Sequence, residues 1–572
     1  MAHGSVHNQT VVARDDAALG IPKRARRASG FPLLAPATAV RAFVAITLCG
    51  SILALLVRLV AGAIRKPFFM DEAVTGMISA RPLRELLETT VWERGGAPAH
   101  FVATHVFFLF DSSPIALRLV SVTFALLTVA VSFDLGRRLG GPTAGAIAAA
   151  VAATSALLVI YGTYGRMYSM FAFAGGLACD LFIRAMRKRT VGAAVAGALA
   201  ASFLAAVHPF GGLLVAIEAC VAIWLWRGRP LRAGLPVMAI ALGTVSVLGL
   251  ADLRLGNRFS TAIAPHSSLL TPKAAAIEIV QALLGYSGGI TIAALILVPL
   301  GLLGAYVVIR KEPLISAVTI FPFLAVLLIE MAISTSGGIN PSTRHLIFML
   351  PAWSAFVGVA TTRLAAGYRA SVALGFFAAV IAAAAFGGAV NGMGKALDPR
   401  ADPLWSKAGT SRALRAPAHW VQTRVRADDV LFPYSPPYLE ALPQTAKAFS
   451  LPRDPPTTIL AALGHIRYPV ANVFVALPVP QAKVDLDALT RSLGPRYTVV
   501  RFQSWLLLEA HGPFRSGERV LAAVLSSARA AGGAISGATA EGRFYLRVVT
   551  SNVCYAHHSL AAKADHCPAL VS

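Results

Sequence analysis

The chain is short of charged residues. Only 14% of its 572 residues are Asp, Glu, Lys or Arg, against about a quarter in an ordinary soluble protein. Hydrophobic residues make up 56%, and the mean hydropathy is +0.66. A fold in water cannot hide this much apolar surface in one or two cores. The composition therefore excludes a soluble globular protein and makes a lipid bilayer the natural solvent.

The chain also lacks the motifs typical of a metal, nucleotide or redox site. It has five cysteines but no Cys-x-x-Cys pair, no His-Glu-x-x-His segment and no glycine-rich phosphate loop. Cys49, Cys179 and Cys220 lie in apolar runs and are interpreted as packing residues. Cys554 and Cys567 lie in the tail and can form a disulfide if the tail is outside the cytoplasm. The sequence leaves that pairing open.

Apolar runs separated by short basic gaps are what the chain has in abundance. A membrane-spanning helix needs about 20 mainly apolar residues, and about eleven runs qualify. Most of the formal charge of +24 falls in the gaps, so topology explains it and we expect no nucleic-acid partner. The predicted spans are 40–64, 115–136, 142–162, 167–184, 191–208, 211–226, 234–252, 289–309, 314–333, 344–362 and 371–390.

Basic residues mark alternate gaps, and the N-terminal cluster at 23–27 falls on the same side. The positive-inside rule makes that side cytoplasmic. An odd span count then divides the chain into a disordered basic cytoplasmic N-terminus (1–39), a transmembrane domain (40–390) and a soluble extracytoplasmic domain (391–572). We expect a multi-pass protein of the plasma or inner membrane.

Two regions are expected outside the bilayer. The first outer loop, 65–114, holds the apolar segment 98–110, which is too short to span and is interpreted as an interfacial helix. The tail alternates between helical and strand patterns, which favours an α/β domain behind a linker at 391–417. The predicted fold class is thus mostly α, a polytopic bundle with a C-terminal α/β domain. Expected tail helices are 416–425, 457–466, 484–493 and 516–530, and expected strands are 429–433, 472–477, 497–508 and 543–549.

An acidic pair, Asp71 and Glu72, directly follows the first span. Two carboxylates beside an apolar stretch are costly to desolvate. Adjacent helical residues point in different directions, so one can take a proton while the other binds a hydroxyl or a metal. A hydrated pair favoured by the helix dipole explains the position equally well. A divalent metal here is left open, because the spacing offers no ligand set, and no other cofactor is expected.

Further polar residues lie at the outer ends of spans. One outer turn carries Arg166 among three tyrosines, Tyr161, Tyr164 and Tyr168, and could bind a lipid phosphate. An aromatic belt with a snorkelling arginine is the alternative. The outer arginines Arg118 and Arg344 break the charge rule, so each is a candidate for a phosphate or for anionic headgroups.

Histidines and one intramembrane carboxylate complete the candidates. His208 lies at an outer span end, His345 follows Arg344, and His100 and His105 lie in the interfacial segment. A lone histidine at such a place is more often a satisfied interfacial residue than a ligand. Glu218 lies well inside a span, where a carboxylate is a functional candidate or a protonated packing residue.

Taken in order, these clusters resemble a family. The sequence is similar to the GT-C superfamily of integral-membrane glycosyltransferases, which includes protein O-mannosyltransferases and lipid A aminoarabinose transferases. The resemblance covers roughly residues 40–390. It rests on the segments Met70–Ala73, Pro98–His105, Ala116–Ser121, Gly165–Met170, His208–Gly211 and Arg344–Pro351.

The resemblance implies transfer of a sugar from a polyprenyl-phosphate donor to an acceptor hydroxyl on the outer face. It implies a single inverting displacement, with Asp71 as the general base and Glu72 holding the acceptor or ordering the loop. Arg118, Arg166 and Arg344 would bind the donor phosphate, with Tyr168 as a hydrogen-bond donor. Tyr161, Tyr164, His105, His208 and His345 are further candidate site residues.

Two other functions stay open. A transporter or flippase of a lipid-linked sugar is the alternative that Glu218 favours, although the other polar residues lie at span ends rather than at the midplane. A non-catalytic scaffold would leave Asp71 and the outer arginines without a common purpose. The sequence does not identify the sugar, nor whether the acceptor is a lipid, a glycan or a protein.

Overall fold

The structure is a computed structural model of the chain. It describes residues 36–94, 97–208, 210–225, 272–335, 343–365 and 403–561, together with Gly243, Val247 and Cys567. The predicted span 234–252, apart from those two residues, and the predicted span 371–390 lie outside this part of the chain. So does nearly all of the predicted N-terminal region 1–39.

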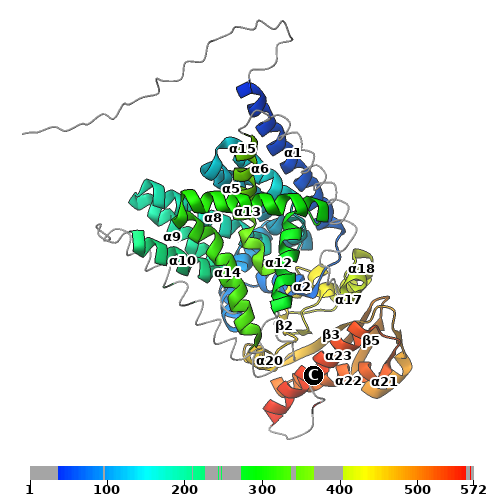
Figure 1. Ribbon diagram of the computed structural model, residues 1–572. Coiled ribbons are helices and arrows are strands. Elements are labelled where there is room, and N and C mark those ends of the chain that lie inside the picture. Colours follow the sequence, from blue (N-terminus) through cyan, green and yellow to red (C-terminus); the bar gives the residue numbers. More distant parts are fainter. Residues whose placement is uncertain are drawn as a thin grey trace, which may run out of the picture.

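Long apolar helices form one half of the molecule, and the tail lies at one end of them (Figure 1). Five helical segments in the described ranges are long and apolar enough to cross a membrane, so the chain is a multi-pass membrane protein. They lie in α1 (Pro36–Arg65), α5 (Pro114–Gly140), α8 (Tyr168–Lys188), α13 (Thr291–Lys311) and the 3₁₀ helix η2 (Thr343–Met349) continued by α15 (Leu350–Ala365).

The predicted span 142–162 is a bent pair rather than one helix. α6 (Pro142–Thr154) and α7 (Ala156–Gly162) meet at 60°, and the Ser155 hydroxyl accepts a hydrogen bond from Leu158 N that begins the second helix. Counting the pair as one span gives six, and the count of eleven is not confirmed. Helices that do not reach the length or apolarity of a span over their described residues occupy three more predicted positions: α9 (Val191–Val207), α10 (Gly211–Leu225) and α14 (Pro313–Thr335).

Short helices form the loop that follows the first span. α2 (Met70–Ser79) and α3 (Leu83–Arg94) follow the first span, and α4 (Ala99–Phe108) has only ten residues, as predicted for the interfacial segment. A further helix, α12 (Pro272–Tyr286), precedes α13. These short helices lie at the end of the bundle that faces the tail, where α2 packs against tail residues in one shared hydrophobic core.

A mixed five-stranded sheet organises the tail, in the order β2-β1-β3-β6-β5. β1 pairs in parallel with β2 and β3, while β6 runs antiparallel to β3 and β5. The strands are β1 (Val430–Phe432), β2 (Phe449–Ser450), β3 (Val470–Pro478), β5 (Tyr497–Arg501) and β6 (Trp505–Phe514), with a separate pair of β4 (Lys483–Val484) and β7 (Ile535–Ser536). The helices are α17 (Pro403–Ala408), α18 (Ser411–Gln422), α19 (Pro436–Glu440), η3 (Thr445–Lys447), α20 (Pro456–Leu463), α21 (Leu486–Leu493), α22 (Gly517–Ala534) and α23 (Ala540–Ala561).

Two of the expected tail strands were wrong. The run 497–508 is a hairpin, because the chain reverses between Phe502 and Trp505, where Phe502 N donates to Trp505 O at 2.8 Å. The run 543–549 belongs to helix α23. Its aromatic and β-branched residues suggested a strand, but Tyr545, Leu546 and Val549 are buried with a spacing of three to four residues. That spacing is the period of a helix packed on one face.

Part of the predicted linker 391–417 is an ordered junction. Phe68 N, at the end of the first span, donates to Gly409 O at 2.8 Å. The indole of Trp505 in β6 donates to Ala408 O at 2.7 Å. The segment after α17 is therefore held on one side by the membrane domain and on the other by the sheet.

Two buried polar contacts also fix the tail to the outer helices. Arg81 donates to Ser450 O at 3.2 Å, and its guanidinium lies 4.6 Å from the centre of the Phe449 ring. The Tyr434 hydroxyl donates to Glu93 Oε2 at 3.0 Å. These contacts tie the ends of α2 and α3 to β2 and to the segment after β1, so the tail covers this end of the bundle.

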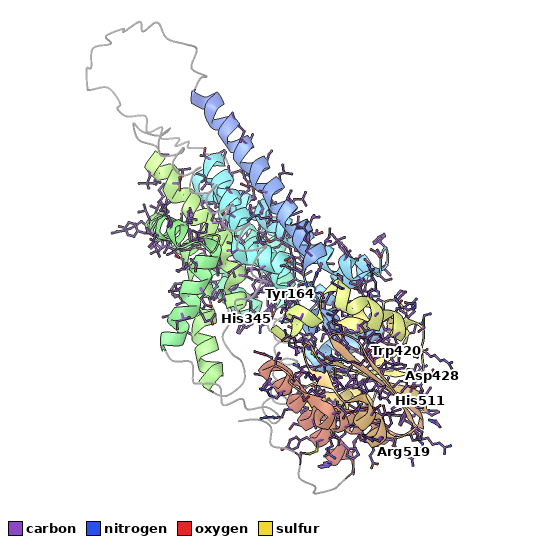
Figure 2. The ribbon with its side chains drawn as sticks, turned by 90° about the vertical axis from the view of Figure 1, so that its right-hand side faces the viewer. Tyr164, His345, Trp420, Asp428, His511 and Arg519 are labelled. Atoms are coloured by element: carbon purple, nitrogen blue, oxygen red, sulfur yellow. A yellow bond between two sulfur atoms is a disulfide. The ribbon has the colours of Figure 1, made fainter. Side chains whose placement is uncertain are left out.

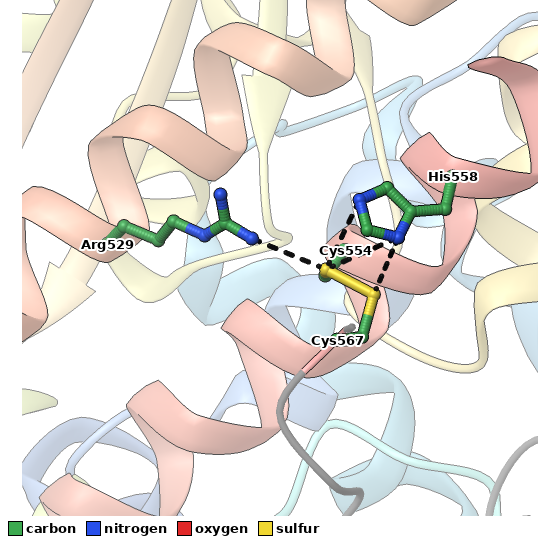
Figure 3. The surroundings of a disulfide bond; sticks show 4 residues. All are labelled: Arg529, Cys554, His558 and Cys567. Carbon is green, nitrogen blue, oxygen red and sulfur yellow. Dashed lines mark hydrogen bonds between the residues drawn. A yellow bond between two sulfur atoms is a disulfide. The ribbon is translucent and has the colours of Figure 1, made fainter. Parts of the chain in front are cut away.

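A disulfide joins Cys554 of α23 to Cys567 beyond its end (Figure 3). His558 and Arg529 lie against the two sulfurs. The two tail cysteines thus pair, a point that the sequence left open.

Candidate active site

Glu72 is the most completely enclosed carboxylate of the site. Its side chain is 0% exposed and accepts two hydrogen bonds from Arg118, at 2.7 and 2.8 Å. The backbone N–H of Gly165 adds a third at 2.9 Å, and that of Phe69 a fourth at 3.1 Å. The Phe69 contact caps the start of α2. Glu72 therefore joins three chain segments and fixes the start of α2, the turn that carries Asp71.

Arg118 has no donor left for a ligand. Nε and one Nη2 proton bind Glu72, and the other three N–H groups donate to the carbonyls of Ala63, Lys66 and Pro67, each at 2.9 Å. These carbonyls lie at the end of α1, where four carbonyls lack helical partners. Its guanidinium also lies 4.0 Å from the centre of the Phe68 ring. The phosphate-binding role expected for Arg118 stays a prediction, and its present contacts are all within the protein.

Asp71 lies next to Glu72 but in a different environment. Its side chain is half-buried, and Oδ2 accepts a hydrogen bond from the Tyr164 hydroxyl at 3.2 Å. Burial, and then the nearby Asp71 carboxylate, raise the pKa of Tyr164 well above its ordinary value. The phenol therefore keeps its proton and remains a donor to Asp71. The side chains of Asp71 and Glu72 thus point to different partners, as expected for adjacent residues of a helix.

Arg166 faces the same turn of α2. Its Nη1 donates to Asp71 O at 3.4 Å and to Thr75 Oγ1 at 3.3 Å. Thr75 was missed by the sequence analysis, although its position four residues after Asp71 places both on one helix face. Nε of Arg166 is buried and has no hydrogen-bond partner within the described ranges. Arg166 is thus held beside Asp71 with its buried Nε unused among the described residues.

Aromatic rings connect this turn to the start of the last described span. Tyr164 and Tyr168 are parallel, with ring centres 6.5 Å apart, and Tyr161 lies 4.9 Å from Tyr168. The Arg344 guanidinium lies 5.5 Å from the centre of the Tyr168 ring. Asp71 and Tyr168 are both within electrostatic reach of Arg344. Residues far apart in sequence therefore meet around one carboxylate.

Two predicted histidines extend the same array. The His208 ring lies 6.4 Å from Tyr168 and 5.4 Å from His345. Figure 2 shows Tyr164 and His345 at the end of the bundle that faces the tail. His105 lies elsewhere: its Nδ1 is 2.9 Å from Ser79 O, at the end of α2, so it fastens α4 to α2.

His100 is a site residue whose importance the sequence did not indicate. It is 1% exposed, and neither ring nitrogen has a hydrogen-bond partner among the described residues. Burial, and then the positive charge of Arg166, lower its pKa to about 3, while the Gly165 backbone opposes the shift. A neutral imidazole is therefore held beside Arg166. A single histidine in an apolar run carries no signal that distinguishes this placement from ordinary packing.

The sequence-predicted residues thus divide into three groups. Asp71, Arg166, Tyr164, Tyr168, Tyr161, Arg344, His208 and His345 form one array, Glu72 and Arg118 form an enclosed pair behind it, and His105 lies at a helix contact. Their roles in binding and catalysis remain predictions. The metal that the sequence left open at Asp71 and Glu72 is likewise untested.

No protein-family model and no curated protein sequence matches the chain. Solved structures do match. ArnT from Cupriavidus metallidurans in the apo state aligns with a TM-score of 0.54 at 12% identity, over 82% of this chain and 98% of that chain. ArnT bound to undecaprenyl phosphate aligns with a TM-score of 0.53 at 14% identity, over 83% and 98%. The archaeal oligosaccharyltransferase AglB from Archaeoglobus fulgidus, at a TM-score of 0.43 and 12% identity over 74% and 69%, is more distant.

The chain therefore shares the fold of ArnT, which agrees with the fold that the sequence resemblance to GT-C proteins implied. The alignment covers nearly the whole of ArnT, so membrane domain and tail are both part of the likeness. At this identity the likeness establishes a shared fold. What the site does has to be argued from its own residues.

Proposed function

We propose that the chain is a glycosyltransferase that moves a sugar from a polyprenyl-phosphate donor to an acceptor hydroxyl. The observation that carries the proposal is one half-buried carboxylate, Asp71, whose backbone carbonyl accepts a hydrogen bond from Arg166 and whose side chain lies within electrostatic reach of Arg166 and Arg344. A general base close to fixed positive charges suits a displacement that creates an anionic leaving group.

Asp71 is the proposed base. It takes the proton of the acceptor hydroxyl while the hydroxyl oxygen bonds to the anomeric carbon of the donor sugar. The bond from that carbon to the phosphate oxygen breaks in the same step, and the electron pair leaves with the polyprenyl phosphate. The sugar is inverted at its anomeric carbon. The neutral Tyr164 hydroxyl, 3.2 Å from Oδ2, orients the carboxylate.

Arg166 and Arg344 are the proposed phosphate ligands. Each has a buried Nε without a hydrogen-bond partner in the described ranges, and Tyr168 lies beside Arg344 as a possible hydroxyl donor. Charge-assisted bonds from arginine to phosphate are strong where water is excluded. Arg118, whose donors are all used, would act indirectly by holding Glu72 and thus the Asp71 loop.

The proposed side of reaction is the extracytoplasmic face of the plasma or inner membrane. Two features support it: the basic residues of the alternate gaps, which favour a cytoplasmic N-terminus, and the Cys554–Cys567 disulfide, which forms in oxidising compartments. Both features support a tail outside the cytoplasm. The domain division at 39 and 390 is part of this proposal.

Sugar transfer by the purified full-length protein in nanodiscs tests the proposal. The donors are polyprenyl phosphates that carry mannose, arabinose or aminoarabinose. We expect the wild type to turn over one of them and Asp71→Asn to lose at least a hundredfold of that rate. Asp428→Asn is the matched control, since Asp428 is an exposed tail carboxylate far from Tyr164 in Figure 2. Full transfer by Asp71→Asn would exclude Asp71 as the base.

The second candidate is a transporter of a lipid-linked sugar. Glu218 in α10 favours it, because this carboxylate is 2% exposed and its Oε1 has no partner among the described residues. Lipid-linked sugar translocation across vesicles separates the two functions. Translocation that Glu218→Gln abolishes and Asp71→Asn leaves intact would favour the transporter.

A further inference from the structure

A polar cluster of the tail lies near Asp71 and has no part in the chemistry above. It consists of Arg453, Asp454, Tyr545 and Asn552, here called the tail cluster. Arg453 and Asp454 lie between β2 and α20, while Tyr545 and Asn552 lie two turns apart on α23. Residues seven apart share one helix face, so both α23 side chains face the segment that follows β2.

The cluster is held by direct contacts. Arg453 Nη2 donates to Asp454 Oδ2 at 3.2 Å, and the Arg453 guanidinium lies 5.1 Å from the centre of the Tyr545 ring. Asn552 Nδ2 donates to Arg453 O at 3.5 Å. Trp405 packs edge-on against Tyr545 with ring centres 5.5 Å apart. The cluster therefore brings together a guanidinium group, a side-chain amide, a carboxylate and a phenol ring.

Its hydrogen bonds are incomplete. Arg453 Nε, Tyr545 Oη and Asn552 Oδ1 are buried and have no partner within the part of the chain that the structure describes. Each such atom costs about 1–3 kcal/mol, and native proteins keep only a few per hundred residues. Three buried atoms without a partner in a cluster of only four residues indicate a site for a ligand. The side chains of Arg453 and Asp454 are 26% and 36% exposed, so this edge of the cluster is accessible from outside.

The cluster is electrostatically linked to the proposed base. Burial opposes the charge of Arg453, but Asp454, Tyr545 and Asp71 together raise its pKa above its ordinary value. Asp71 of the membrane domain is thus within electrostatic reach of this tail arginine. The charge of Arg453 is therefore partly compensated within the protein, chiefly by its direct neighbour Asp454.

We propose that the tail cluster is the acceptor subsite and that it binds a neutral carbohydrate. Sugar hydroxyls both donate and accept, which matches the unused N–H and O–H of Arg453 and Tyr545 and the unused carbonyl of Asn552. An anionic ligand at the cluster itself would meet the Asp454 carboxylate, which is already paired with Arg453. The proposal rests on the proposed function, because the bound glycan presents its hydroxyl to Asp71.

Binding without turnover tests the subsite separately from the chemistry. The probes are mannotetraose and an arabinofuranose tetrasaccharide, both free of lipid and phosphate, added to full-length protein in nanodiscs without donor. Binding is followed by saturation-transfer NMR. We expect wild type to bind at least one probe and Arg453→Gln to bind it about tenfold more weakly, which is about 1.4 kcal/mol. The matched control is Arg547→Gln, an exposed arginine of α23 outside the cluster, which should bind within twofold of wild type.

Asn552→Ala tests the same subsite from α23 and guards against misfolding of Arg453→Gln, with thermal unfolding measured for both. We expect both variants to raise the acceptor KM, while Arg547→Gln keeps the acceptor KM within twofold of wild type. Tetrasaccharide binding unaffected by both variants would overturn the subsite, as would no binding by wild type or binding of a hydroxyl-bearing peptide or lysolipid instead. Wild-type protein that binds the tetrasaccharide but never turns over a donor would instead contradict the proposed function.

Discussion

Two polar regions meet at the end of the bundle that faces the tail, and they differ in how far their hydrogen-bonding groups are satisfied by the protein. Around Glu72 and Arg118, each guanidinium N–H and both carboxylate oxygens have protein partners. Around Arg166, Arg344 and His100, buried nitrogens have none among the described residues. A folded protein normally satisfies its buried polar groups. The difference separates residues whose buried polar groups are satisfied by the fold from residues whose buried nitrogens have no partner in the described part of the chain.

Disrupting the Glu72–Arg118 pair should reduce the stability of the fold more than any other change considered. Glu72→Gln leaves Arg118 as an uncompensated buried charge, and removing one partner of such a pair costs about 3–5 kcal/mol. We expect a large loss of thermal stability in detergent and little recoverable protein. Glu88→Gln is the control, since Glu88 forms an exposed ion pair with Arg84 at 2.9 Å that contributes close to nothing. A stable but inactive Glu72→Gln protein would move Glu72 into the catalytic group.

Substitution of Arg166 or Arg344 should have the opposite effect, with activity lost and stability kept. Arg344→Gln and Arg166→Gln remove proposed stabilisers of the leaving phosphate, so transfer should fall about 10²–10³-fold while the unfolding temperature changes little. Arg363→Gln, an exposed arginine near the far end of α15, should keep its activity. Large destabilisation with normal activity per folded molecule would show that these arginines belong to the fold.

His100 should have a smaller effect on stability, and that effect should depend on pH. Its pKa is about 3 in the folded protein and about 6.5 in an unfolded chain. Between those values the unfolded state binds the extra proton, so stability present above about pH 6.5 is lost as the pH falls. We expect the unfolding temperature to drop between pH 7 and 5, and to drop less in His100→Gln. His419→Gln, an exposed tail histidine, should behave like wild type, and an unchanged pH dependence in His100→Gln would contradict the placement.

Local sequence predicted the elements better than it predicted the contacts. The first span, the short helix at 98–110 and the divergence of Asp71 from Glu72 depend on length and helical period, which are properties of neighbouring residues. The partners of Arg118 were hidden, because carbonyls at the end of α1 come into reach only when α5 packs beside it. His100 was hidden for the same reason, since its burial against Arg166 depends on a residue 66 positions away.

The tail shows the same limit. Its strand β3 was predicted from a run of apolar residues, whereas 543–549 has strand-like composition and is helical because α22 offers a face to pack on. The segment after the last predicted span was expected to be a linker and is partly a junction, because Gly409 meets the backbone of Phe68. Tertiary partners decided both outcomes.

The most direct test is a structure of the full-length protein in nanodiscs with undecaprenyl phosphate, determined by electron cryo-microscopy. We predict the phosphate between Arg166 and Arg344, within hydrogen-bond distance of both guanidinium groups, with Glu72 and Arg118 unmoved. A phosphate bound to Arg118 after rupture of its pair with Glu72, or bound away from Asp71 altogether, would contradict the division between the two regions.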